Sequence, residues 1–118
     1  MIKNVQQDGD LFIAEAKDMV TKEDIESLIP MAEEMISQYG KIKCLVIINE
    51  MKGYSVDGFL ADFGFYFKHK DNFSYMAIVG DKKLEKAMNV FLTMFFKDKA
   101  KYFETSDLDK AKEWIKQV

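Results

Sequence analysis

The 118-residue sequence has few of the residues that build metal sites and covalent cross-links, with one cysteine and one histidine. A single cysteine excludes a disulfide within the chain and is typical of a protein from a reducing compartment. A structural zinc site needs several cysteine or histidine ligands, so we expect neither a metal nor another cofactor. Cys44 opens an apolar run and is interpreted as a small buried residue.

Long apolar runs, excess positive charge and linker-like segments are also missing. No stretch approaches the roughly 20 apolar residues of a membrane span, and no long apolar segment follows Lys3, so no signal peptide is expected. The net charge of −3 argues against nucleic-acid binding, which requires a basic face. One proline and six glycines leave no room for a low-complexity linker, so residues 1–118 are predicted to form a single, cytoplasmic domain.

The sequence does contain an alternation of strand-like and helix-like segments. Strand candidates cover residues 2–7, 11–16, 44–49, 75–80 and 100–104, and helical periodicity covers 21–39, 56–70, 81–96 and 106–118. A turn containing Gly9 joins the first two strands as a hairpin. The order ββαβαβαβα predicts an α/β fold with a mostly parallel five-stranded sheet.

The first predicted helix has clear end signals and one internal conflict. Thr21 and Asp24 have the spacing of a capping box, and Gly40 fits the residue that follows the last turn. Pro30 lies inside the helical pattern, where it cannot donate a backbone hydrogen bond and clashes with the preceding turn. We therefore expect a break near Ile29, with a second helical piece that begins at Pro30.

Candidate catalytic groups are sparse. His69 lies among charged residues at a helix end, where it is interpreted as a solvated side chain near the last carbonyls. Gly80 follows a strand but lacks the other glycines of a nucleotide-binding loop. We assign no catalytic residue, and an enzyme that uses Glu50, Tyr54 and Asp57 is the third-ranked alternative.

The segment "NEMKGYSVDGF" follows the central strand, at the end where open α/β sheets usually place functional groups. Its loop candidates are Tyr54, Ser55 and Asp57. Ser55 is interpreted as the cap of the next helix. The alternative is a phosphorylation or ligand site, because helix N-termini attract anions.

Several phrases of the chain together resemble the SpoIIAA-like family, whose fold is related to STAS domains and anti-sigma-factor antagonists. These phrases are "TKED" before a helix with an internal proline, "YGKIK" before the central strand, the Gly53–Tyr54 turn before an aromatic helix, "FKHKDNF" and "AIVGDKK". The resemblance covers nearly the whole chain. It implies strands in largely sequential order, and it implies lipid or other apolar-ligand binding and membrane association as suggested for some members.

The resemblance does not carry over the phosphorylation switch of the anti-sigma-factor antagonists. In those proteins a phosphorylated serine follows an aspartate, whereas here Asp57 is followed by Gly58 and Ser55 precedes it. We therefore predict that Ser55 is not a phosphorylation switch.

Two helices have more apolar residues than one buried stripe needs. We expect two core stripes, which comprise Val56, Phe59, Leu60, Phe63, Tyr66 and Phe67 in one helix and Leu84, Met88, Phe91, Leu92 and Phe95 in the other. The residues expected outside these stripes are Phe65, Val90, Met94 and Phe96. They form a candidate apolar-ligand or interface site, and Lys97, Lys99 and Lys101 form a candidate basic rim for lipid headgroups. The competing interpretation is a wide buried face with scattered surface apolar residues and solvated lysines.

The sequence therefore favours a non-catalytic SpoIIAA-like domain that binds an apolar small molecule or lipid, with peripheral contact to a membrane. The alternative is a protein-interaction module of the anti-sigma-factor-antagonist type, and a homodimer is a further candidate use of the apolar residues.

Overall fold

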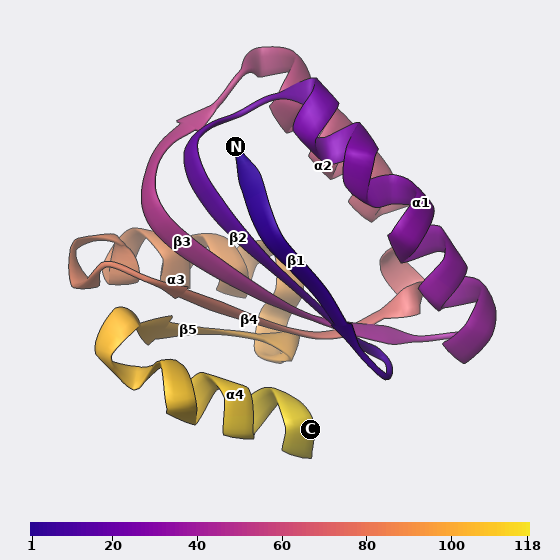
Figure 1. Cartoon of the computed structure of the whole chain (residues 1–118). Coiled ribbons are helices and arrows are strands. Elements are labelled where there is room, and N and C mark those ends of the chain that lie inside the picture. Colours follow the sequence, from indigo (N-terminus) through magenta and orange to yellow (C-terminus); the bar gives the residue numbers. More distant parts are fainter.

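The computed structural model describes residues 1–118 as one five-stranded sheet with four helices (Figure 1). The elements are β1 (Ile2–Asp8), β2 (Leu11–Val20), α1 (Lys22–Tyr39), β3 (Ile42–Tyr54), α2 (Val56–Lys68), β4 (Phe73–Gly80), α3 (Glu85–Phe96), β5 (Ala100–Glu104) and α4 (Leu108–Gln117). The strand order is β1-β2-β3-β4-β5; β1 and β2 are antiparallel and the other neighbours are parallel. The predicted fold class and hairpin are confirmed.

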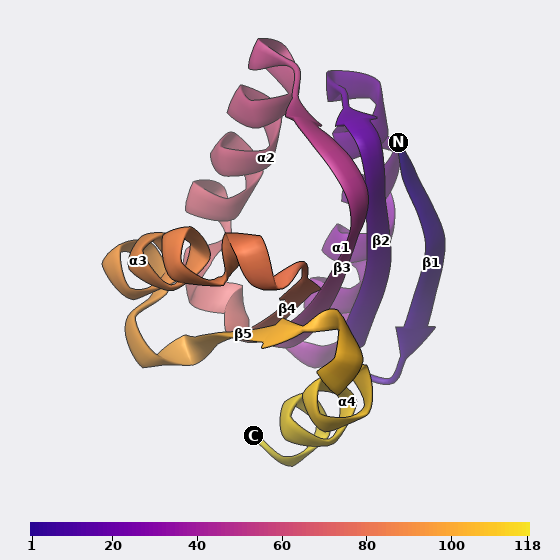
Figure 2. The same cartoon turned by 90° about the vertical axis from the view of Figure 1, so that its left-hand side faces the viewer.

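Helices cover both faces of the sheet, and α4 lies on the face opposite to α1, α2 and α3 (Figure 2). Alternate residues of β2 and β3 divide between the two cores. Leu11 and Leu45 pack with Ile115 of α4, whereas Phe12 and Cys44 pack with Met35 of α1. This division explains why the central strands are apolar at successive positions.

Helix α1 runs without interruption from Lys22 to Tyr39, so the predicted break at Ile29 and Pro30 is wrong. Pro30 removes the hydrogen bond to the carbonyl of Glu26, but both residues are exposed. Water can reach that carbonyl, so the proline leaves no buried polar group unsatisfied. The capping box of Thr21 and Asp24 is confirmed.

Strand β3 extends well beyond its neighbour β4. It pairs with β4 only as far as Ile47, but it pairs with β2 as far as Tyr54. Helix α2 begins at the far end of this extension and returns beside α1 (Figure 1). Because little of the sheet lies beneath it, α2 has only one buried residue, Gly58.

Gly58 sits where α2 meets the junction between β2 and α1. An added Cβ at this position would lie 2.7 Å from the carbonyl oxygen of Val20 and 2.9 Å from the carbonyl carbon of Thr21. The same Val20 carbonyl accepts a hydrogen bond from the Ser55 amide at 2.9 Å. Backbone atoms of two segments therefore meet at a distance that only glycine allows, and this contact fixes the start of α2.

We predict opposite effects for two Gly→Ala substitutions in α2. Gly58→Ala should lower the free energy of unfolding by about 1–3 kcal/mol, because the new methyl group overlaps backbone atoms that cannot rotate away. Gly64→Ala should raise it by about 0.5–1 kcal/mol, because nothing lies within 4 Å of the added Cβ and alanine favours the helix. Urea denaturation of both variants measures the difference. Equal stability of the two variants would contradict the close approach at Gly58.

Candidate functional site

Helix α2 turns a face of small and polar residues toward the protein interior. Gly58 is buried, Ala61 packs against the cluster of Ala16, Val20 and Ile25, and Asp62 is partly buried. Phe65 continues this face, with its ring 4.7 Å from that of His69. The spacing of three and four residues places these side chains on one stripe of the helix.

The aromatic stripe of α2 faces outward. Val56 is 80% exposed and Leu60 is 63% exposed, and Phe59 and Phe67 are also exposed. The predicted helical grouping is right, but the assignment of these four residues to the core is wrong, while Phe63 and Tyr66 of the same stripe are partly buried. The physical reason is the Gly58 contact, which brings the opposite, small-residue face of the helix against the β2–α1 junction.

Helix α3 extends this apolar surface. The Phe63 ring lies 5.8 Å from that of Phe91 and 6.0 Å from that of Phe95, both in T-shaped contacts. Beside them, Val90 is 60% exposed and Met94 is 69% exposed. We call the combined surface the outer face. Its exposed members are Val56, Phe59, Leu60 and Phe67 of α2 and Val90, Met94 and Phe95 of α3, and the partly buried rings of Phe63 and Phe91 join the two helices beneath them.

The four predicted apolar site residues divide between surface and interior. Val90 and Met94 lie on the outer face, as their position outside the core stripe predicts. Phe65 lies on the inner side of α2, 6.2 Å from the Phe73 ring. Phe96 packs against the core cluster around Leu92, with its ring 4.7 Å from that of Tyr66. Phe65 and Phe96 are therefore partly buried rather than exposed, and Phe96 also lines a groove at the C-terminal end of α3.

The predicted basic rim also divides. Lys97 and Lys99 follow α3 and, like Phe95, line a groove at its C-terminal end. Lys101 instead lies over the ring of Phe103, with its ammonium 5.1 Å from the ring centre. Phe103 belongs to the core beneath α4, so Lys101 lies on the other side of the sheet.

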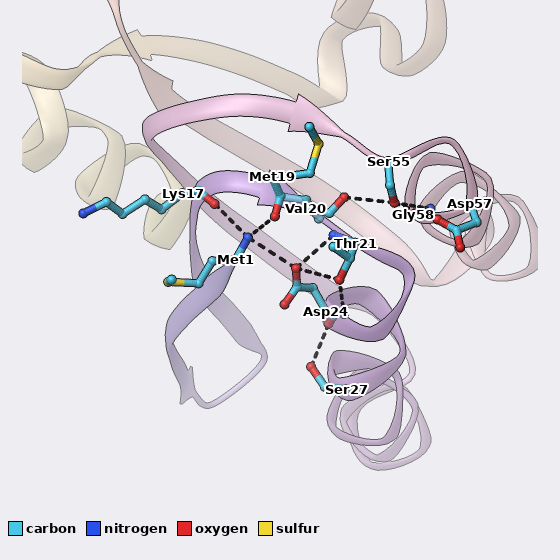
Figure 3. Close-up of polar contacts among 10 residues, drawn as sticks. All are labelled: Met1, Lys17, Met19, Val20, Thr21, Asp24, Ser27, Ser55, Asp57 and Gly58. Carbon is cyan, nitrogen blue, oxygen red and sulfur yellow. Dashed lines mark hydrogen bonds and ion pairs between the residues drawn. The ribbon is translucent and has the colours of Figure 1, made fainter.

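The loop residues before α2 are engaged with one another (Figure 3). The Ser55 hydroxyl accepts a hydrogen bond from the Gly58 amide at 3.1 Å and donates one to the Asp57 carboxylate at 2.7 Å. The hydrogen bond from Ser55 is the largest influence on the pKa of Asp57, which it lowers. Ser55 is therefore the cap of α2, as predicted.

Figure 3 also shows that the neighbouring start of α1 is held by the first residue of the chain. The α-amino group of Met1 donates to the carbonyl oxygens of Lys17 and Met19, and it lies 3.3 Å from the Asp24 carboxylate. The capping box and this ion pair tie β1, β2 and α1 together next to the start of α2.

Asp62 places a carboxylate on the inner side of α2. The Tyr54 hydroxyl donates a hydrogen bond to Asp62 at 3.0 Å. Burial raises the pKa of the Asp62 carboxyl, and the Tyr54 hydrogen bond opposes that shift. Burial also raises the pKa of the Cys44 thiol to about 12, and the negative charge of Asp62 adds to this shift. The thiol is therefore held neutral and is a poor nucleophile.

The remaining polar groups form no metal cluster. No group of three or more histidine, cysteine, aspartate or glutamate side chains lies close enough to hold a metal ion. No hydrogen bond or ion pair joins Glu50 to Tyr54 or to Asp57. Tyr54 bonds to Asp62 instead, and Asp57 bonds to Ser55. No helix is both long and apolar enough to cross a membrane.

These features define an α/β domain with a SpoIIAA-like fold. The SpoIIAA-like family model matches residues 11–116, and the chain belongs to this family. A similar solved structure is an uncharacterized protein from the DUF3478 family, with a SpoIIAA-like fold, from Shewanella loihica PV-4. It shares 23% identity and a TM-score of 0.77 over 97% of this chain and 93% of that chain, which shows a common fold. Comparison with curated proteins found no matching sequence.

The orientation of α2 is the feature that the sequence pattern missed. Hydrophobic periodicity assigns the most apolar stripe of a helix to the core. The opposing signal was present in Gly58, Ala61 and Asp62, which have the spacing of a second stripe suited to close packing.

We predict that Asp62→Asn stabilises the protein most near neutral pH. The raised pKa means that ionised Asp62 destabilises the folded state above that pKa. This cost disappears as the pH falls through the folded pKa towards the ordinary value of 3.8, because the folded protein then takes up the proton. Asparagine is neutral throughout and keeps an oxygen acceptor for Tyr54.

The difference in melting temperature between Asp62→Asn and the wild type should thus be positive at pH 7 and shrink towards pH 4. Comparing variant with wild type at each pH removes the effects of the other carboxylates. A difference that is the same at both pH values would show that the charge of Asp62 does not destabilise the folded protein.

Proposed function

We propose that this SpoIIAA-like domain is non-catalytic and binds lipid at a membrane surface through the outer face. The observation that carries the proposal is the inverted orientation of α2, which packs Gly58 and Ala61 inward and leaves Val56 and Leu60 in solvent. Large contiguous apolar surfaces on a folded protein are typical of sites that contact another apolar phase or partner.

The composition of the outer face fits insertion into the membrane interface. It is formed by two adjoining helices that present aromatic rings, Leu60, Val90 and Met94. Helices that lie in the interface bury an apolar face of this kind and keep polar residues on the other side. Burial of a fully exposed large apolar side chain contributes about 1.5–3 kcal/mol, so several such residues suffice for binding.

The lysines favour an anionic lipid surface as the partner. Although the whole chain has a net charge of −3, residues 63–100 contain seven of its 17 lysines and only four of its 20 acidic residues. Lys68 follows Phe67 directly, and Lys97 follows the end of α3. A basic residue near an anionic membrane contributes about 1 kcal/mol.

The packing between the helices favours a lipid surface over a small molecule enclosed between them. The rings of Phe63, Phe91 and Phe95 meet at the junction of α2 and α3, with centroids 4.8–6.0 Å apart. Phe63 and Phe91 are partly buried, Phe91 packs against the core cluster around Leu92, and Phe95 is exposed. The apolar residues are therefore arranged as a surface rather than as the wall of a closed cavity.

Cosedimentation with vesicles tests the proposal. The double variant Leu60→Gln, Met94→Gln should bind phosphatidylcholine–phosphatidylglycerol vesicles at least about tenfold more weakly than the wild type, because two apolar side chains no longer enter the bilayer. Met19→Gln is the matched control, since Met19 is 45% exposed but lies outside α2 and α3. The melting temperatures should stay close to that of the wild type.

Two results would contradict this proposal. One is the absence of wild-type binding to vesicles of any composition. The other is a dimer in solution that the double variant abolishes, which would assign the outer face to a second copy of the chain.

A further inference from the structure

A groove with a volume of about 310 Å³ lies at the C-terminal ends of α2 and α3. Its lining includes Tyr66, Lys70, Phe73, Phe96, Lys97 and Lys99. Phe95 belongs to both the lining and the outer face, so the groove adjoins the outer face at this residue. Its volume is at the lower end of the range for small-molecule sites.

One side of the groove is aromatic. The Tyr66 ring lies 4.7 Å from that of Phe96 and 5.8 Å from that of Phe73. The Tyr66 hydroxyl is protonated at neutral pH and can donate a hydrogen bond, and burial and the nearby charge of Asp71 raise its pKa further. These rings provide an apolar wall with one polar group, which suits the boundary between a lipid headgroup and its chains.

Three lysines line the same groove without ion-pair partners. Lys70, Lys97 and Lys99 take part in none of the four ion pairs of the structure. Asp71 and Asp98 also line the groove, which gives these five side chains a net charge of +1. This charge fits one phosphate group better than a headgroup with several phosphates.

Lys97 is held in an unusual backbone conformation at the rim of this groove. Its φ of 57° and ψ of −125° lie in a region that side chains rarely adopt, and Lys97 ends α3. Such a conformation costs free energy in a residue other than glycine, and residues of this kind cluster at ligand-binding sites.

We propose that this groove binds the phosphate headgroup of an anionic lipid with a small head, of the phosphatidic acid type. Lys70, Lys97 and Lys99 provide the charge-assisted hydrogen bonds to the phosphate, and the acyl chains extend past Phe95 along the outer face. This inference rests on the proposed membrane function, to which it adds a headgroup preference.

The test uses soluble dihexanoyl phosphatidic acid, inorganic phosphate, and vesicles of phosphatidylcholine with or without phosphatidic acid. Isothermal titration calorimetry should show saturable binding of the short-chain lipid and much weaker binding of inorganic phosphate. In the double variant Lys97→Gly, Lys99→Gln, affinity for the short-chain lipid should fall at least about tenfold, because two charged contacts are lost. The vesicle preference for phosphatidic acid should disappear.

The matched control is Lys82→Gln, Lys86→Gln, which removes the same charge from the start of the α3 region outside the groove. Its affinity for the short-chain lipid should match that of the wild type. The single variant Lys97→Gly should melt at or above the wild-type temperature, because glycine adopts positive φ freely, so weaker binding cannot come from unfolding.

Equal loss of binding in both double variants would overturn the site, because it would show a general charge effect. Equal affinity for inorganic phosphate and the short-chain lipid would show that the groove recognises phosphate alone, which would contradict a lipid ligand. If vesicles bind through the outer face without a phosphatidic acid preference, the headgroup site fails while the membrane proposal stands. Saturable, lysine-dependent binding of the short-chain lipid without binding to any vesicle would support the site and contradict the membrane proposal.

Discussion

The contact between Gly58 and the β2–α1 junction determines how α2 is presented to solvent. The carbonyl of Val20 accepts a hydrogen bond from the Ser55 amide and leaves no space for a Cβ at position 58. This contact places one narrow stripe of the helix against the protein. Because Gly58, Ala61 and Asp62 occupy that stripe, the aromatic residues on the opposite side face outward.

The functional proposals follow from this orientation. With α2 inverted, Phe63 meets Phe91 and Phe95 at the junction with α3, and the two helices form one apolar surface. The C-terminal ends of both helices lead into lysines, and the groove between these ends adjoins the apolar surface at Phe95. An apolar face beside a basic groove is complementary to an anionic amphiphile, so the proposed ligand uses both features.

Sequence patterns were sufficient for the fold, but not for the continuity of α1 or for which face of α2 is exposed. The apolar runs, the turn at Gly9 and the caps at Thr21 and Ser55 are local signals, and the structure confirms them. The outcome at Pro30 depends on solvent at the Glu26 carbonyl, and the outward face of α2 depends on a contact with a residue 38 positions earlier in the chain. Neither can be read from periodicity, because both are set by what surrounds the helix.

The central claim is that the outer face enters the lipid interface, and site-specific labelling tests it most directly. The only native cysteine, Cys44, is buried and its thiol pKa is about 12, so an introduced surface cysteine can be labelled selectively. An environment-sensitive dye on Val90→Cys should shift its emission to the blue when anionic vesicles are added, and the same dye on Met19→Cys should not. An unchanged spectrum at position 90 in vesicle-bound protein, or an equal shift at both positions, would contradict the account.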